Sequence, residues 1–94
     1  MTKTTLAERK ARDAAFDELM ASINPAFALR REMKAARTRA SLSQRELAGR
    51  MGTTQPMIAR LESGGRSPNI KTLRKLAEAT GSRLVIRLEA AQRD

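Results

Sequence analysis

The side chains of this chain that can do chemistry are guanidinium, ammonium, amide and carboxyl groups. The chain contains no cysteine and no histidine, which removes thiolate nucleophiles, the commonest general base and the usual metal ligands. It also lacks tyrosine and tryptophan, the aromatic side chains on which nucleotide bases usually stack. Its carboxylates are scattered rather than grouped with a partner base or a phosphate-binding loop. The composition therefore predicts a binding protein that is not an enzyme, with no metal, no cofactor and no small-molecule ligand.

The positive charge of the chain is confined to one part of it. The formal net charge is +9. Within residues 1–24, four basic residues balance four acidic ones, so the whole excess lies between residues 25 and 94. A localised excess of positive charge of this size favours a polyanion as partner. The alternative is an ordinary solvated basic surface.

Membrane insertion and export are not expected. No apolar run approaches the roughly 20 residues that a membrane-spanning helix needs, and residues 1–10 lack the pattern of a signal peptide. We therefore expect a cytoplasmic protein without membrane contact.

Apolar spacing and capping residues predict five helices. They cover residues 6–23, 25 to about 39, 43–51, 55 to about 62 and 70–80. Ser43 and Glu46 form a capping box, and Leu42 and Leu47 have the spacing of a hydrophobic staple. The predicted core positions recur at helical spacing: Phe27, Leu29, Met33, Ala36, Leu47, Ala48, Met51, Ile58, Leu61, Ile70, Leu73, Leu76 and Ala77.

The residues that follow Gly81 predict a β-strand and, through it, a dimer. The apolar period changes there from 3.6 to 2, as in a half-buried strand. A single strand cannot satisfy its own backbone, so we expect it to pair with the same strand of a second copy across a two-fold axis. The alternative is that it extends a sheet in another protein. The residues assigned to dimerisation are Leu84, Val85, Ile86, Arg87 and Leu88.

The third and fourth predicted helices have the spacing of a helix-turn-helix. They are joined by about three residues, with Gly52 supplying the positive φ of the turn. Ala48 is small enough for a steep helix crossing, while Ile58 and Leu61 point inward. The alternative is an ordinary helical hairpin, but the coincidence of these offsets in a basic domain favours a helix-turn-helix that contacts DNA.

The run LSQRELAGRMGTTQPMIARLESG, residues 42–64, resembles the Xre family, the class of the lambdoid phage repressors and Cro. The resemblance covers roughly residues 29–81 and implies a mainly α, five-helix, lambda-repressor-like fold, here with the C-terminal strand added. The sequence QPMIARLE, together with a helical N-terminal extension and the strand, is similar to HigA-type antitoxins. The expected organisation is an extension over 1–24, a DNA-binding domain over 25–81 and a dimerisation strand and tail over 82–94.

The resemblance implies roles for individual residues in binding double-stranded DNA. Gln44 would bond a backbone phosphate, and Gln55 would pair with adenine. Arg60 would contact either guanine or a phosphate. Pro56 departs from the phage repressors, because it has no donor where they often carry a polar base-contacting residue. The DNA-binding set implied by the resemblance is Gln44, Thr53, Thr54, Gln55, Pro56, Met57, Arg60, Arg66 and Lys71.

Other charged residues have a second interpretation. Arg66 and Lys71 are either phosphate clamps or solvated charge. Arg37 and Glu62 match positions that form an internal ion pair in the phage repressors, so for them the resemblance implies a structural role.

The function implied is a sequence-specific repressor that binds a palindromic operator as a homodimer. The narrower resemblance implies an antitoxin that neutralises a basic toxin, an mRNA endonuclease of the HigB/RelE type, and represses its own operon. The alternatives are a stand-alone Xre regulator of phage or host origin and, more distantly, a basic RNA- or ribosome-binding protein. The apolar positions of the neutral N-terminal helix suit either packing on its own core or docking of the toxin: Phe16, Leu19, Met20 and Ile23.

Overall fold

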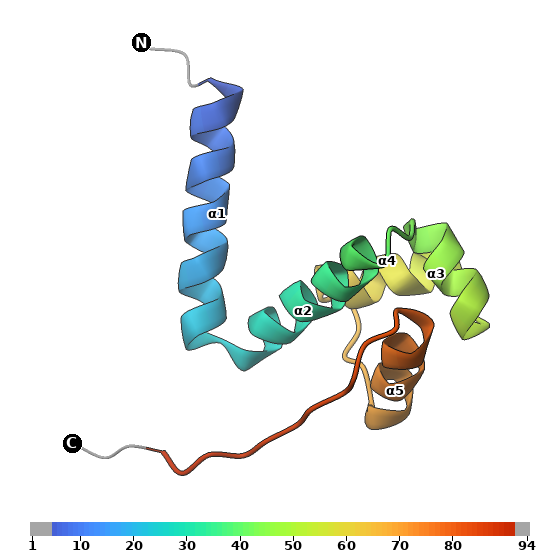
Figure 1. The fold of residues 1–94 in the computed structure, drawn as a ribbon. Helices are drawn as coiled ribbons and strands as arrows, with labels where there is room; N and C mark the ends of the chain where they lie inside the picture. The colour runs from blue at the N-terminus through green and yellow to red at the C-terminus, as the bar shows by residue number, and fades with distance from the viewer. Residues whose placement is uncertain (1–4, 92–94) are drawn as a thin grey trace.

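The computed structural model describes residues 5–91, which form five helices joined by short connections (Figure 1). The helices are α1 (Leu6–Ile23), α2 (Pro25–Arg39), α3 (Gln44–Met51), α4 (Gln55–Ser63) and α5 (Ile70–Ala79). The mainly helical prediction is confirmed, because every expected helix is present and its bounds differ from those expected by about one residue.

Side-chain caps determine where the helices begin. The Asn24 side chain accepts hydrogen bonds from the amides of Ala26 and Phe27 at the start of α2. At the start of α3, Ser43 Oγ accepts from the Glu46 amide and Glu46 Oε1 accepts from the Ser43 amide, both at 3.0 Å. These bonds satisfy amides that have no partner inside the helix.

The core lies among α2, α3, α4 and α5. Helix α2 packs on α4, and α3 packs on both α4 and α5. Leu47 and Ile58 are the largest side chains that are completely buried. The buried part of α5 starts at Leu73. Ile70 was expected to point inward, but it is exposed at the first position of α5, before the helix reaches the core.

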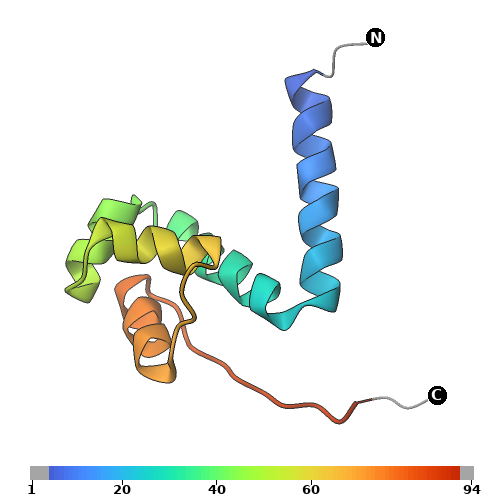
Figure 2. The same cartoon turned by 180° about the vertical axis from the view of Figure 1, so that it is seen from behind.

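Helix α1 stands away from this core as an arm that contacts α2 (Figures 1 and 2). It buries no residue, so the interpretation that its apolar positions pack on the protein's own core is wrong. The contacts that hold it to α2 are an edge-to-face pair of Phe16 and Phe27, with ring centroids 6.4 Å apart, and an exposed ion pair of Glu18 with Arg31. The arm helps to explain a radius of gyration of 15.6 Å, against about 12 Å for a compact chain of this length.

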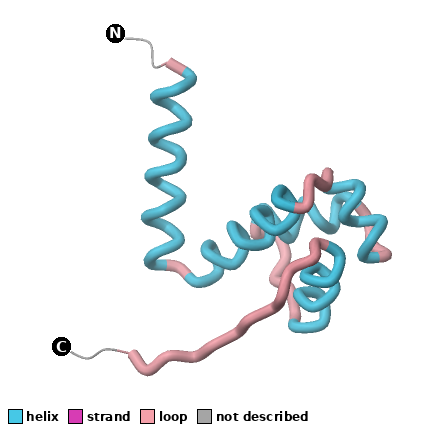
Figure 3. Tube along the Cα trace, in the orientation of Figure 1, coloured by secondary structure: helices cyan, strands magenta, loops and turns pink. Residues whose placement is uncertain are grey.

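The predicted C-terminal strand is not supported. Within the described part of the chain, residues 82–91 are extended and belong to no sheet (Figure 3). A strand needs a neighbouring backbone to bond, and the single chain offers none there. Leu84 packs against the core, whereas Val85, Ile86 and Leu88 are exposed. We call residues 82–91 the C-terminal segment.

None of the helices in residues 5–91 is both long enough and apolar enough to cross a bilayer.

Candidate nucleic-acid interface

Helices α3 and α4 form a helix-turn-helix. The chain leaves α3 at Gly52, which has a φ of 68°, a conformation that costs other residues about 1 kcal/mol or more. The Thr53 amide donates to the Ala48 carbonyl at 2.9 Å and closes the turn. Ala48 is buried in the same core cluster as Ile58 and Leu61 of α4, where a larger side chain would crowd its neighbours. The turn therefore presents the first residues of α4 at the surface.

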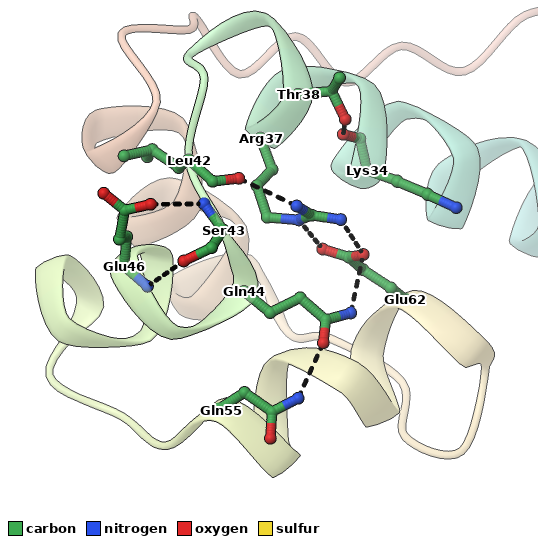
Figure 4. Close-up of polar contacts among 9 residues, drawn as sticks. All are labelled: Lys34, Arg37, Thr38, Leu42, Ser43, Gln44, Glu46, Gln55 and Glu62. Atoms are coloured by element: carbon green, nitrogen blue, oxygen red, sulfur yellow. Dashed lines mark hydrogen bonds and ion pairs between the residues drawn. The ribbon is translucent and has the colours of Figure 1, made fainter.

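A hydrogen-bonded ion pair ties α2 to the C-terminal half of α4 (Figure 4). Arg37 Nε lies 2.7 Å from Glu62 Oε2, and Arg37 Nη2 donates to Glu62 Oε1 at 3.0 Å. Arg37 Nη1 donates to the Leu42 carbonyl at 2.9 Å. The exposed fractions of the two side chains are 14% for Arg37 and 6% for Glu62. The Arg37 guanidinium thus links α2, the connection between α2 and α3, and α4, which is the geometry of a structural ion pair.

The Glu62 carboxylate also accepts a hydrogen bond from Gln44, whose side chain in turn contacts Gln55 at the start of α4 (Figure 4). Gln44 Nε2 donates to Glu62 Oε1 at 3.3 Å, and Gln55 Nε2 donates to Gln44 Oε1 at 2.8 Å. Gln44 and Gln55 are the first residues of α3 and α4. The Gln55 amide is therefore held in one orientation by a relay that begins at Arg37, which we call the Arg37–Gln55 relay.

Two ionisable groups around the interface are shifted by their hydrogen bonds. The side-chain bond to Glu62 raises the pKa of Arg37 above its ordinary value, against the opposing effect of burial. The backbone hydrogen bond from Ser43, followed by the bond to its side chain, lowers the pKa of Glu46. Both shifts favour the charged form, so Arg37 in the relay and Glu46 in the α3 cap stay charged at neutral pH.

The remaining residues expected at DNA lie on the outer surface around α4. Thr54, Pro56 and Arg60 are exposed on α4 or at its start. Arg66 and Lys71 are exposed beyond it. Each of these positions is accessible to a large ligand.

A cavity of about 230 Å³ lies between the turn, α4 and the first turns of α5. Thr53 of the turn, Met57 of α4 and Arg66 of the loop before α5 all line it. Lys71 is not part of its lining, and Lys75, one turn further along α5, takes that place. The cavity therefore presents two cationic side chains beside the helix-turn-helix.

Comparison with known proteins agrees with this geometry. Residues 33–86 match the helix-turn-helix family. The chain belongs to that family. The match starts within α2 and ends within the C-terminal segment, so it covers the helix-turn-helix and leaves out α1.

Two curated relatives extend the comparison. An uncharacterized HTH-type transcriptional regulator of Haemophilus influenzae is 37% identical over 70 residues, which cover 74% of this chain and 71% of the relative. Antitoxin HigA1 of Mycobacterium tuberculosis is 34% identical over 84 residues, which cover 89% of this chain. The matched region is 56% of HigA1, so this chain spans about half of that protein. No solved structure matches the chain.

Sequence reasoning missed two features of this helix-turn-helix domain. The Gln44 to Gln55 hydrogen bond was not anticipated, although each glutamine opens its own helix and the short turn brings those ends together. Lys75 was also not predicted to lie beside the helix-turn-helix, although it lines the cavity there. Its spacing of four residues from Lys71 places both on one side of α5, and this was the signal available.

Proposed function

We propose that this chain is a sequence-specific transcriptional repressor that binds double-stranded DNA with the N-terminal end of α4 in the major groove. The observation that carries the proposal is the Arg37–Gln55 relay, because it orients one amide at the outer end of the second helix of a helix-turn-helix. A side chain held in one rotamer before binding loses less conformational entropy when it meets a base.

The free hydrogen-bonding groups of Gln55 match adenine. Its amide carries two N–H donors and a carbonyl acceptor, and the bond to Gln44 uses one donor. The second donor suits adenine N7 and the carbonyl suits the adenine amino group. Gln44 likewise keeps one N–H for a backbone phosphate. Arg60 is assigned to guanine, with Arg66 and Lys71 as phosphate contacts, and the residues around the turn complete the surface: Thr53, Thr54, Pro56 and Met57.

The test uses duplexes selected from a random-sequence DNA library with the unmodified chain. Gln55→Ala should weaken binding to the selected duplex by about 1–3 kcal/mol and leave binding to unselected DNA nearly unchanged. Gln44→Ala should lose both this specific term and a phosphate contact, and the effects of the two substitutions should not add because the residues are bonded to each other.

Lys71→Gln is the matched control for a phosphate contact. It should weaken binding to all duplexes alike and lower the slope of log affinity against log salt by about one. If Gln55→Ala behaves in the same way as Lys71→Gln, the base-contacting role of Gln55 is wrong.

We further propose that the chain acts in the cytoplasm as a homodimer on a palindromic operator. One α4 helix contacts few base pairs, and a two-fold dimer doubles the sequence that is recognised. The dimer contacts are assigned to the exposed C-terminal segment, at Leu84, Val85, Ile86, Arg87 and Leu88.

The regulatory role proposed is that of an antitoxin of a type II toxin–antitoxin pair. HigA1 supports it, since the similarity covers 89% of this chain and extends beyond the helix-turn-helix. The partner would be a basic mRNA endonuclease of the HigB/RelE type. A second candidate, a stand-alone regulator, is favoured by the relative from Haemophilus influenzae, which is named as a transcriptional regulator only.

Expression of the neighbouring gene separates these two roles. An antitoxin requires that a neighbouring product stops growth when it is produced alone and that co-expression of this chain restores growth. If no neighbouring product is toxic, while the selected duplex is still bound, the stand-alone role is supported instead.

A further inference from the structure

One face of α1 carries large apolar side chains that stay mostly exposed in the single chain, although the Phe16 ring also contacts Phe27 of α2. Phe16, Leu19 and Ile23 are spaced three and four residues apart, so they share one face of the helix. Each is more than half exposed, with an exposed fraction of 59% at Leu19. We call these three residues the α1 stripe. Their exposure in water is unfavourable unless another surface covers them.

The C-terminal segment has the same property. Val85, Ile86 and Leu88 are exposed, with an exposed fraction of 58% at Ile86. The backbone of residues 83–90 is extended and has no regular partner in the described chain. The segment therefore offers both apolar side chains and hydrogen-bonding groups to a neighbour.

The charges of these two surfaces are complementary. Residues 13–23, which contain the stripe, include three acidic residues and no basic residue: Asp13, Asp17 and Glu18. The C-terminal segment includes two basic residues, Arg83 and Arg87, and one acidic residue, Glu89, which pairs with Arg87 at 3.1 Å. Arg83 is therefore the basic group of the segment that this pair leaves over. Contact between them would bring opposite charges to the rim of an apolar centre, which favours the encounter and its register.

The fold keeps these surfaces apart within one chain. Helix α1 rises from its junction with α2 in one direction, and the C-terminal segment leaves α5 toward the other side of α2 (Figures 1 and 2). The contacts of Phe16 with Phe27 and of Glu18 with Arg31 hold α1 in this position. A second copy can bring the missing surface to each without moving α1.

We propose that the α1 stripe of one copy packs on the C-terminal segment of a second copy, and that the reverse contact forms across a two-fold axis. This inference rests on the proposed homodimer and names its contact surface. Each copy carries a net charge of +9, so two copies repel each other. Residues 1–24 are neutral overall, which makes α1 the part of one copy that a basic segment of another can approach at least cost.

Cysteine cross-linking tests the contact directly, because the natural chain has no cysteine. The Leu19→Cys and Ile86→Cys variants are each oxidised alone. They are also mixed in reductant, so that subunits exchange, and then oxidised together. The expected result is a disulfide-linked dimer in the mixture and not in either variant alone.

Three other patterns would overturn the proposal. Linkage in Ile86→Cys alone would indicate that two C-terminal segments meet, and linkage in Leu19→Cys alone that two α1 helices meet. The absence of any linked dimer, with monomers in sedimentation until a basic partner protein is added, would assign the stripe to that partner.

Self-association supplies an independent measurement. Leu19→Ser should raise the dissociation constant of the dimer by roughly tenfold or more, because less apolar area is buried on association. Ala7→Ser, on the opposite face of α1, is the control and should leave the dimer unchanged. The helices should persist in both variants, because α1 contributes nothing to the buried core. Equal dimer affinity in the two variants would contradict the proposal.

DNA binding measured on the same samples separates this inference from the proposed function. If the mixed disulfide forms but no duplex is selected from the library, the proposed function fails and the contact stands. If the chain binds its selected duplex as a dimer without the mixed disulfide, the contact fails alone.

Discussion

Removal of the Arg37 guanidinium should strongly destabilise the domain. Arg37→Met keeps the aliphatic stem but deletes two bonds to Glu62 and one to the Leu42 carbonyl. Glu62, whose side chain is 6% exposed, would keep only the 3.3 Å contact with Gln44. Breaking a buried pair by removing one partner costs about 3–5 kcal/mol. Because 14% of the Arg37 side chain remains exposed, we expect the lower end, about 3 kcal/mol.

Thermal unfolding followed by circular dichroism measures this effect. Each kcal/mol lowers the Tm of a domain of this size by about 4–8 °C, so the Tm of Arg37→Met should fall by roughly 12–24 °C. Arg31→Met is the matched control, since Arg31 lies on the same helix and its pair with Glu18 is exposed to solvent. Solvent screens such a pair, and the Tm of this control should hardly change.

The double variant Arg37→Met/Glu62→Met distinguishes folding from orientation of the interface. Replacing both partners by apolar groups removes the unpaired Glu62 charge, so the Tm of the double variant should be well above that of Arg37→Met. Gln44 would still have lost its anchor, so specific DNA affinity should not recover with the Tm. A fall in Tm for Arg37→Met no larger than that for Arg31→Met would refute this reasoning, because it would show that solvent screens the pair.

Three further substitutions test the local structure. Gly49→Ala should stabilise the domain by about 0.5–1 kcal/mol in urea unfolding, because Gly49 is helical and nothing lies within 4 Å of an added Cβ. Gly64→Ala should instead destabilise it by about 1–2 kcal/mol, because φ is +89° and the new Cβ would lie 2.8 Å from Arg30 Nη1; equal effects would contradict both. The lowered pKa of Glu46 stabilises the fold above the ordinary pKa of about 4.3, and this contribution is lost as pH falls through the lower folded value. Glu46→Gln should therefore flatten the dependence of Tm on pH in this acidic range, and an unchanged slope would exclude Glu46 as its source.

The bounds of the helices could be predicted from sequence because the signals that set them are local. The Ser43–Glu46 capping box spans four residues, and Gly52 ends α3 through its own backbone conformation. A cap or a left-handed glycine acts within about one turn, so neighbouring letters of the sequence contain the whole interaction.

The arrangement at a distance was decided by the tertiary structure. The alternation after Gly81 predicted a strand, but a strand requires a neighbouring backbone and the fold provides none within the chain. The apolar face of α1 has helical spacing whether a core covers it or not, and only the path of the chain after Asn24 leaves it exposed.

The same division applies within the candidate interface. The resemblance to the Xre family implied separate DNA contacts for Gln44 and Gln55, which are the first residues of α3 and α4. Their mutual bond, and the tie of Gln44 to Glu62, depend on how α2, α3 and α4 pack together. Side-chain hydrogen bonds form only within about 3 Å and over a narrow range of angles. Helix spacing in the sequence cannot specify such distances, because they arise only when the buried faces of three helices meet.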